Sequence, residues 1–182
     1  MVNGRCGVDD LRGMVDGLLQ ESTGVVEALR AQRTREILDH KGENVDQNLS
    51  DVTALAALIC QVPVSTITLI DAHDQYIRGH HGVADHLLCL PREEGLCKIT
   101  IQDPEKPTII YDALIDSRVQ SSPFVNGDYD RVRFYAGLPL TTPEGVALGS
   151  ICVLDHQPRE LTEDQMMALK RLRALALRIL LT

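Results

Sequence analysis

The stretch that decides the fold is RVRFYAGLPLTTPEGVALGSICVLD, residues 131–155. Two apolar runs, 132–141 and 146–154, lie on either side of the tetrapeptide TPEG at residues 142–145. Proline and glycine favour a tight turn, and runs of this length rich in Val, Leu and Ile favour strands. The stretch therefore predicts a β-hairpin of two antiparallel strands.

The first arm of this hairpin carries a cation and a phenol. Successive side chains of a strand point to opposite faces, so Arg133 and Tyr135 are expected on the same face. Such a pair could orient a small anionic or polar ligand. Alternatively, Arg133 forms an ion pair with an acid of the neighbouring loops, Asp112, Asp116 or Asp130, and closes a loop over the sheet.

Further strands are expected towards the N-terminus. Residues 64–70 (VSTITLI) alternate β-branched and polar side chains, and residues 75–79 follow after the turn formers DAHD at 71–74. These segments predict a second hairpin. A short strand is expected at 108–110, whereas residues 117–130 are rich in Ser, Asp, Asn and Gly and indicate a loop or one weak helical turn.

Helices are expected at both ends of the chain. Thr162 and Gln165 form a capping-box pattern that begins a C-terminal helix. A second helix is expected over about 50–60, ending before Pro63. From Leu11 to Leu29, apolar residues recur every three or four positions, which indicates either a helix that pairs with another chain or one that packs on its own domain. The residues of this spacing are Leu11, Val15, Leu18, Ser22, Val25 and Leu29.

Together these segments predict an α+β fold, with an antiparallel sheet of about five to six strands and the N- and C-terminal helices packed on one face. The polar stretch 39–48 is the expected linker. We therefore expect an N-terminal helix and linker over residues 1–45, with a capacity to form dimers, and one domain over residues 46–182.

Composition excludes several classes of partner. The chain of 182 residues has a net charge of -8, the wrong sign for a surface that neutralises nucleic-acid phosphates. No apolar run approaches the ~20 residues of a membrane span, and the N-terminus lacks a signal-peptide pattern. We therefore expect a cytoplasmic protein without nucleic acid or membrane partners. Aromatic residues make up only 3% of the chain, which argues against a broad planar chromophore.

Cysteines and histidines are the remaining candidates for chemistry. Cys89 and Cys97 lie on either side of a turn and suit either redox chemistry or simple packing, and none of the five cysteines has an evident partner. His80 and His81 are adjacent, so on a strand they point apart and cannot bind one metal ion together. One of the pair could form a metal site with His86 and Asp85, but the pattern favours histidines on the surface of a polar hairpin.

Several stretches in order resemble a GAF domain of the bacterial signalling type, over about residues 46–181. The stretches are PVSTITLID, LPREEGLCKITI, PTIIYDAL with DSRV, PFVNG, RVRFYAGLPLTTPEGVALGSICVLD and PRELTEDQ. The resemblance implies an antiparallel sheet with helices behind it and a ligand cavity on the other face. It also implies a sensory module that feeds a kinase, a cyclic-di-nucleotide enzyme or another signalling output through its terminal helices.

Carried onto this sequence, the resemblance places the ligand site on three segments: 96–101, the loops of 112–124, and the inner face of 133–137. We also expect the aromatic ring of Phe134 in or beside this region. The candidate ligand-binding residues are Cys97, Ile101, Asp112, Arg118, Phe124, Arg133 and Tyr135. No catalytic or metal-binding residue is assigned, and the cofactor is left open.

The sequence departs from some members of the family. Many relatives have a histidine two residues after the position of Cys97, where this chain has Ile99. Bilin-binding members attach their chromophore through a cysteine that histidine commonly follows, and this chain has no Cys-His dipeptide.

Three functions follow from the resemblance. The first is a non-catalytic sensory domain, a homodimer that binds a small molecule. The second is a thiol enzyme similar to free methionine-(R)-sulfoxide reductases, although the cysteine that the family has before Val132 is absent here. The third is a dimerisation module that binds no ligand.

Overall fold

The computed structural model describes residues 8–39 and 44–182. Its centre is one six-stranded sheet of strand order β3-β2-β1-β6-β5-β4, in which every pair of neighbours is antiparallel. This confirms the expected α+β class and strand number. The strands are β1 (Val64–Ile70), β2 (Asp74–His81), β3 (Cys89–Pro91), β4 (Thr108–Ile110), β5 (Phe134–Thr141) and β6 (Ala147–Asp155).

The two expected hairpins are the core of this sheet. β5 pairs with β6, and β1 pairs with β2 and with β6. Every residue of β1 and β6 is buried, because both faces of the sheet are covered. The β1–β2 turn is held by Asp71, whose Oδ1 accepts hydrogen bonds from the backbone N–H groups of His73 and Asp74, both at 2.8 Å.

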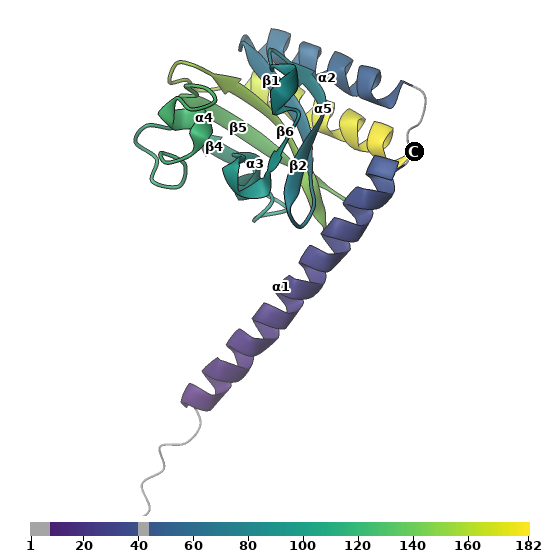
Figure 1. Ribbon diagram of the computed structural model, residues 1–182, viewed down its shortest axis with the longest axis vertical. Helices are drawn as coiled ribbons and strands as arrows, with labels where there is room; N and C mark the ends of the chain where they lie inside the picture. Colours follow the sequence, from purple (N-terminus) through teal and green to yellow (C-terminus); the bar gives the residue numbers. More distant parts are fainter. Residues whose placement is uncertain (1–7, 40–43) are drawn as a thin grey trace, which may run out of the picture.

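Two helices, α2 (Val45–Cys60) and α5 (Glu163–Leu181), cover one face of the sheet (Figure 1). The predicted cap is present: Thr162 Oγ1 accepts from the Gln165 N–H, and the Gln165 side chain accepts from the Thr162 N–H. Leu169 and Ala176 of α5 are fully buried against Ala56 of α2 and the sheet. The strand side chains on this face include Ile67, Leu69, Phe134, Leu138 and Ile151.

Small elements cover the opposite face. They are two short 3₁₀ helices, η1 (Asp85–Leu87) and η2 (Arg92–Glu94), together with α3 (Cys97–Thr100) and α4 (Pro123–Asn126). A second apolar cluster lies between them and the sheet, with Ile70, Tyr135 and Cys152 among its strand residues. These short elements leave room over the sheet that two long helices would have filled.

The first helix, α1 (Val8–Asp39), projects from the domain with its N-terminal half and joins it with its C-terminal half (Figure 1). Thr34 Oγ1 donates to the carbonyl of Ile70 at 3.0 Å, at the end of β1. Leu29, Ile37 and Leu38 pack against the main core. The side chains of residues 8–18, including the predicted Leu11, Val15 and Leu18, lie outside the described residues, as do residues 40–43.

Three local expectations were wrong. The linker expected over 39–48 is too long, because α2 begins at Val45, directly after Asn44 in the left-handed conformation. The strand β3 was missed, since three residues carry no periodicity. Phe134 does not lie beside the cavity, because alternation along β5 sends its ring to the helix-covered face. The domain boundary expected between residues 45 and 46 stays a prediction.

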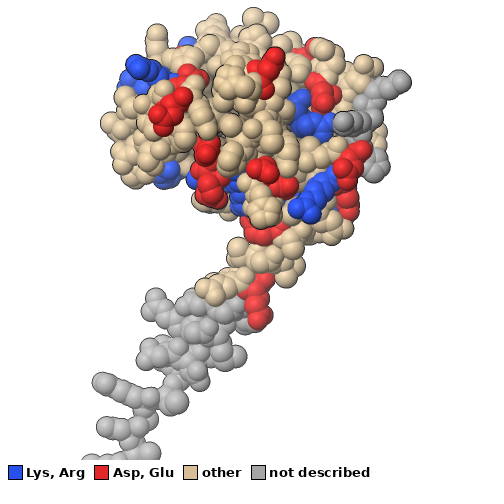
Figure 2. Space-filling model, in the orientation of Figure 1, with Lys and Arg blue, Asp and Glu red and all other residues tan. Residues whose placement is uncertain are grey.

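Charged side chains of both signs are interspersed over the face of the domain shown in Figure 2, and basic side chains do not gather there into a broad patch. Within residues 8–39 and 44–182, no helix is both long and apolar enough to cross a bilayer.

Candidate functional site

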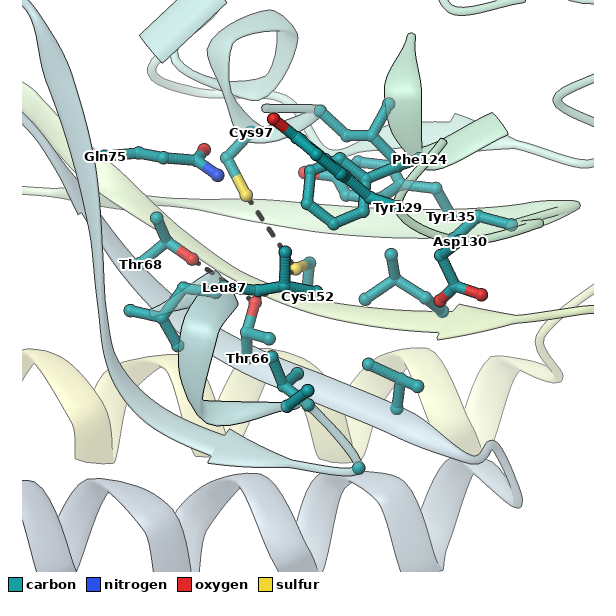
Figure 3. Close-up of a pocket in the computed structure, with 18 residues that line it drawn as sticks. Thr66, Thr68, Gln75, Leu87, Cys97, Phe124, Tyr129, Asp130, Tyr135 and Cys152 are labelled. Atoms are coloured by element: carbon teal, nitrogen blue, oxygen red, sulfur yellow. Dashed lines mark hydrogen bonds between the residues drawn. The ribbon is translucent and has the colours of Figure 1, made fainter. Parts of the chain in front are cut away.

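A cavity of about 190 Å³ lies over the sheet face that α2 and α5 leave uncovered (Figure 3). Strands β1, β2, β5 and β6 form its floor, and the segment after β2, α3 and the loop around α4 form its walls. Ligand pockets for drug-sized molecules usually measure about 300–1,000 Å³. The cavity therefore suits a smaller ligand than those.

The floor of the cavity is polar where the centre of a sheet is normally apolar. Thr66 and Thr68 alternate with Ile67 along β1, so both hydroxyls face the cavity while the isoleucine faces the helices. Their Oγ1 atoms lie 3.3 Å apart, and Thr66 Oγ1 lies 2.9 Å from Cys152 Sγ. The two threonines are 5% and 1% exposed. Buried hydroxyls that face open space can bind a polar ligand.

One buried acceptor in the cavity wall has no partner. Gln75 is 4% exposed and lines the cavity, yet its Oε1 accepts no hydrogen bond. Gly95 makes room for this amide, because a Cβ there would lie 1.8 Å from the same oxygen. An unsatisfied buried acceptor costs about 1–3 kcal/mol, so the amide oxygen of Gln75 is a local destabilising feature beside the cavity.

Two thiols that line the cavity are in contact with each other. Cys97 Sγ at the start of α3 lies 3.9 Å from Cys152 Sγ in β6, and both residues are buried. The hydrogen bond between the two sulfurs lowers the pKa of the Cys97 thiol, in opposition to its burial. The same hydrogen bond and burial raise the pKa of Cys152 well above its ordinary value.

Tyr135 closes the inner end of the site. Its Oη lies 2.7 Å from Thr100 Oγ1, and both residues are fully buried. Gly137 is required beside them, since a Cβ there would lie 2.3 Å from the Tyr135 hydroxyl and 2.5 Å from that of Thr100. Burial and the two thiols raise the pKa of Tyr135 well above its ordinary value, so the phenol stays protonated.

The outer wall is a loop fastened by hydrogen bonds. Tyr129 Oη donates to Glu94 Oε2 at 2.6 Å, and Ser122 Oγ donates to the Glu94 carbonyl at 3.2 Å. The rings of Phe124 and Tyr129 meet edge to face, with centroids 5.4 Å apart. Both rings line the cavity, and Tyr129 is exposed. The cavity therefore opens to solvent past this aromatic pair.

The structure brings three of the seven predicted site residues together: Cys97, Phe124 and Tyr135 all line the cavity. The other four lie elsewhere. Ile101 lines a separate groove against α1, and Asp112 and Arg118 border a shallow depression on the outer loop.

The predicted arginines are occupied by neighbouring acids. Arg133 forms a bidentate ion pair with Asp112, with Nε and Nη2 at 2.8 and 2.7 Å from the carboxylate oxygens, which confirms the ion-pair alternative. This pair lowers the pKa of Asp112. Arg118 is paired in the same way with its neighbour Asp116. Neither arginine lines the cavity.

Sequence reasoning missed the polar residues that the strands contribute to the floor, Thr66, Thr68, Gln75 and Cys152. The alternation of β1 marks the two threonines as sharing a face, so a signal for them exists in the sequence. The pairing of Cys152 with Cys97 has no such signal, because the two are 55 positions apart and meet only through the fold. The expectation that no cysteine has a partner was wrong on this point. Among the described cysteines, Cys60 is buried elsewhere and Cys89 is exposed on β3.

A cluster of charged groups fastens α1 beside the cavity elements. Glu27 bridges two arginines, binding Arg30 of its own helix and Arg92 NH1 of η2 at 2.7 Å. Arg30 is 4% exposed, and its Nε donates to the carbonyl of Ala147 at 2.6 Å, at the start of β6. Burial raises the pKa of Glu27, but the hydrogen bonds from the two arginines outweigh it and hold that pKa below its ordinary value. We call Glu27, Arg30 and Arg92 the α1 clasp.

No protein-family model matches the chain. The chain is similar to a cyclic di-GMP phosphodiesterase of Pseudomonas aeruginosa, with 35% identity over 117 residues. This match covers 64% of the chain and 19% of the phosphodiesterase, so the chain spans about a fifth of the length of this curated relative.

Solved structures show the same fold. The GAF domain of a phosphoenolpyruvate-protein phosphotransferase from Acinetobacter superposes with a TM-score of 0.61 at 17% identity, over 84% of this chain and 93% of that one. A type II free methionine-R-sulfoxide reductase from Thermoplasma acidophilum gives a TM-score of 0.58 at 10% identity, over 75% and 94% of the two chains. The chain therefore has the GAF fold, as the sequence resemblance implied.

Proposed function

We propose that this domain is a sensory module that binds a small uncharged ligand in the cavity and passes the change to α1. The observation that carries the proposal is the cavity itself, with the buried hydroxyls of Thr66 and Thr68 on its floor. The GAF folds of signalling proteins, among them a methyl-accepting chemotaxis protein, support a regulatory role. A cytoplasmic, bacterial setting is part of the same proposal.

The charge of the lining selects the ligand. Among the described residues that line the cavity there is no Lys, Arg or His, and the one ionisable carboxylate is Asp130. Asp130 Oδ1 is engaged by His156 Nε2 at 2.9 Å. Phosphates and carboxylates are bound in proteins by cations and clusters of N–H donors. The cavity therefore disfavours cyclic nucleotides and favours an uncharged polar ligand that hydrogen-bonds with the threonine hydroxyls of the floor.

The same reasoning about charge makes reduction of free methionine sulfoxide our second choice of function. Its substrate, free methionine sulfoxide, is an amino acid whose carboxylate needs a cationic or multi-donor partner. Arg118 and Arg133, the arginines expected at the site, are paired with Asp116 and Asp112 outside the cavity. A reductase fold among the structural neighbours shows the fold alone.

The route from cavity to α1 is short. Cys97 of α3 lines the cavity, and Ile101, directly after α3, lines the groove that Arg30 and Arg92 border against α1. A ligand that displaces α3 thus acts on the seat of the α1 clasp. It shifts α1 only to the extent that it binds one arrangement of α3 more tightly than the other.

We further propose that α1 pairs two copies and carries the signal to an output domain. Along α1, Leu19 is 58% and Val25 is 68% exposed, while Leu29 of the predicted seam packs partly on its own domain. The relative that is a cyclic di-GMP phosphodiesterase makes an enzyme of cyclic di-GMP turnover our choice for the output. Sedimentation of Val25→Glu should show weaker association than the parent chain, and equal association of both would contradict pairing through this face.

A blocked entrance tests ligand binding. Ala84 is exposed and lines the cavity, so Ala84→Trp should fill its mouth without disturbing the core. Native mass spectrometry of freshly purified protein should show a small bound molecule in the parent and none in Ala84→Trp. Ala72→Trp, at an exposed position in the β1–β2 turn, is the matched control and should keep the molecule. Equal occupancy in all three proteins, or in none, would contradict the proposal.

A further inference from the structure

The two thiols of the cavity have the placement of a reactive pair. Cys97 Sγ and Cys152 Sγ lie 3.9 Å apart, and both residues line the same cavity (Figure 3). They are 5% and 1% exposed, so a molecule reaches them only through the cavity. A disulfide bond is about 2.05 Å long, so the sulfurs need to approach each other by only about 2 Å.

The two sulfurs differ in how firmly they are held. Cys152 lies in β6 between two paired strands, opposite Thr66 of β1 and Gly137 of β5, which fixes its backbone on both sides. Cys97 is the first residue of a four-residue helix that is not part of the sheet. Closure of the gap is therefore expected to move α3 towards β6 and to leave the sheet in place.

The cavity restricts which oxidants arrive. Its volume of about 190 Å³ admits a small molecule and excludes a peptide disulfide. Its described lining offers no cation to attract an anion, as argued above. A small uncharged hydroperoxide meets both conditions, and the buried hydroxyls of Thr66 and Thr68 can donate to its oxygens.

We propose that Cys97 and Cys152 are a peroxide-sensing pair, oxidised to a reversible disulfide when a small uncharged hydroperoxide enters the cavity. This inference rests on the proposed function only in using the same cavity as the ligand site, and it names the class of molecule that reacts there.

The reaction balances without a further cofactor. The Cys97 sulfur attacks one peroxide oxygen, so an S–O bond forms as the O–O bond breaks, and the Cys97 proton ends on the departing oxygen as an alcohol or water. The Cys152 sulfur then attacks the sulfenic sulfur of Cys97. The S–S bond forms, the S–O bond breaks, and hydroxide leaves with the Cys152 proton as water. The two sulfurs lose two electrons in total, and the peroxide gains them.

The surroundings favour Cys97 as the attacking group. The hydrogen bond between the two sulfurs lowers the pKa of the Cys97 thiol and raises that of Cys152. Cys60 offers a contrast within the same chain, because burial raises the pKa of its thiol to about 11 and the cavity does not include it. Oxidation is therefore expected at the pair before it occurs at Cys60.

The test counts thiols in a simplified chain. Cys6→Ser/Cys89→Ser leaves three of the five cysteines, Cys60, Cys97 and Cys152. The reduced protein is freed of reductant, treated with hydrogen peroxide, denatured and alkylated with iodoacetamide. We expect three alkylated thiols before peroxide and one after it, Cys60, with the Cys97 and Cys152 peptides linked. Dithiothreitol should restore three.

Two controls separate chemistry from folding. Adding Cys152→Ser to the same chain should abolish the loss of two thiols and leave Cys97 to form a sulfenic acid that dimedone traps. In the unaltered pair, oxidised glutathione, which is charged and too large for the cavity, should react at least about tenfold more slowly than hydrogen peroxide. This second comparison needs no variant at the pair.

Three free thiols after peroxide, a disulfide that includes Cys60, or equal rates with the two oxidants would each overturn the inference. These failures are distinct from failure of the proposed function. If the pair stays reduced while the parent but not Ala84→Trp retains a bound molecule, the sensory proposal stands and the redox inference falls. If the pair is oxidised while no molecule is retained, the reverse holds.

Discussion

Replacing Glu27 by glutamine should loosen α1 from the domain. The substitution keeps the shape of the side chain and removes the charge that bridges Arg30 and Arg92. Arg30 is 4% exposed, and its acceptors in the variant, the carbonyl of Ala147 and the glutamine amide oxygen, are both uncharged. The α1 clasp therefore loses its anion while one of its cations stays buried.

The size of the effect follows from the exposure of the carboxylate. Hydrogen bonds to charged groups contribute about 1.5–3 kcal/mol, and removing one partner of a buried pair costs about 3–5 kcal/mol. The Glu27 side chain is 35% exposed, so solvent screening reduces these values. We expect about 1–2 kcal/mol, which corresponds to roughly a 5- to 30-fold change in the equilibrium for opening α1.

Hydrogen exchange measures this opening directly. Amides of residues 27–39 in Glu27→Gln should exchange roughly 5- to 30-fold faster, while those of α2 and α5 stay unchanged, because local openings report the stability of the segment concerned. Glu36→Gln is the matched control. Glu36 accepts hydrogen bonds from the exposed side chains of Arg33 at 3.1 Å and Gln32 at 2.9 Å, and a surface ion pair of this kind contributes about 0–1 kcal/mol. Unchanged exchange in α1, or an equal increase throughout the domain, would refute the account of the clasp.

Three further predictions concern acid, the outer loop and the last helix. The pKa of Glu27 is depressed in the folded protein, so the contribution of its carboxylate to stability is fully present above the ordinary value of 4.5 and is lost as pH falls through the lower folded value. Amide hydrogen exchange of α1 should therefore accelerate over that pH window in the parent protein and not in Glu27→Gln. Arg133→Gln removes the partner of Asp112, so exchange should accelerate in residues 112–119 without any change in what the cavity retains. Thr162→Ala removes the capping box and should lower the free energy of unfolding by about 1 kcal/mol in a urea titration, and an unchanged midpoint would contradict that role.

Local patterns in the sequence were enough to predict most of the sheet. The alternation around Ile67 and the turn at residues 142–145 carry the periodicity that defines strands, and the cap at Thr162 marks where α5 begins. The third strand escaped notice because its pairing, and not its composition, makes it a strand.

The site was harder to predict than the fold, because it forms from segments that only the fold brings together. Arg133 was a reasonable ligand partner on its own strand, and its engagement by Asp112 depends on where a loop 21 residues away returns. The thiol pair likewise depends on α3 lying above the centre of β6. Gln75 looks like an ordinary hairpin residue until the close approach of Gly95 shows that its amide is buried.

The central claim is that the cavity binds a small uncharged molecule. Its most direct test is a methyl NMR titration of the Thr66 and Thr68 γ-methyl groups with benzamide and benzoate, which share a shape and differ in charge. The account predicts saturable shifts of both threonine signals with benzamide, and none with benzoate at the same concentrations. Shifts with benzoate alone would contradict it. So would a titration in which neither benzamide nor benzoate shifts the threonine signals.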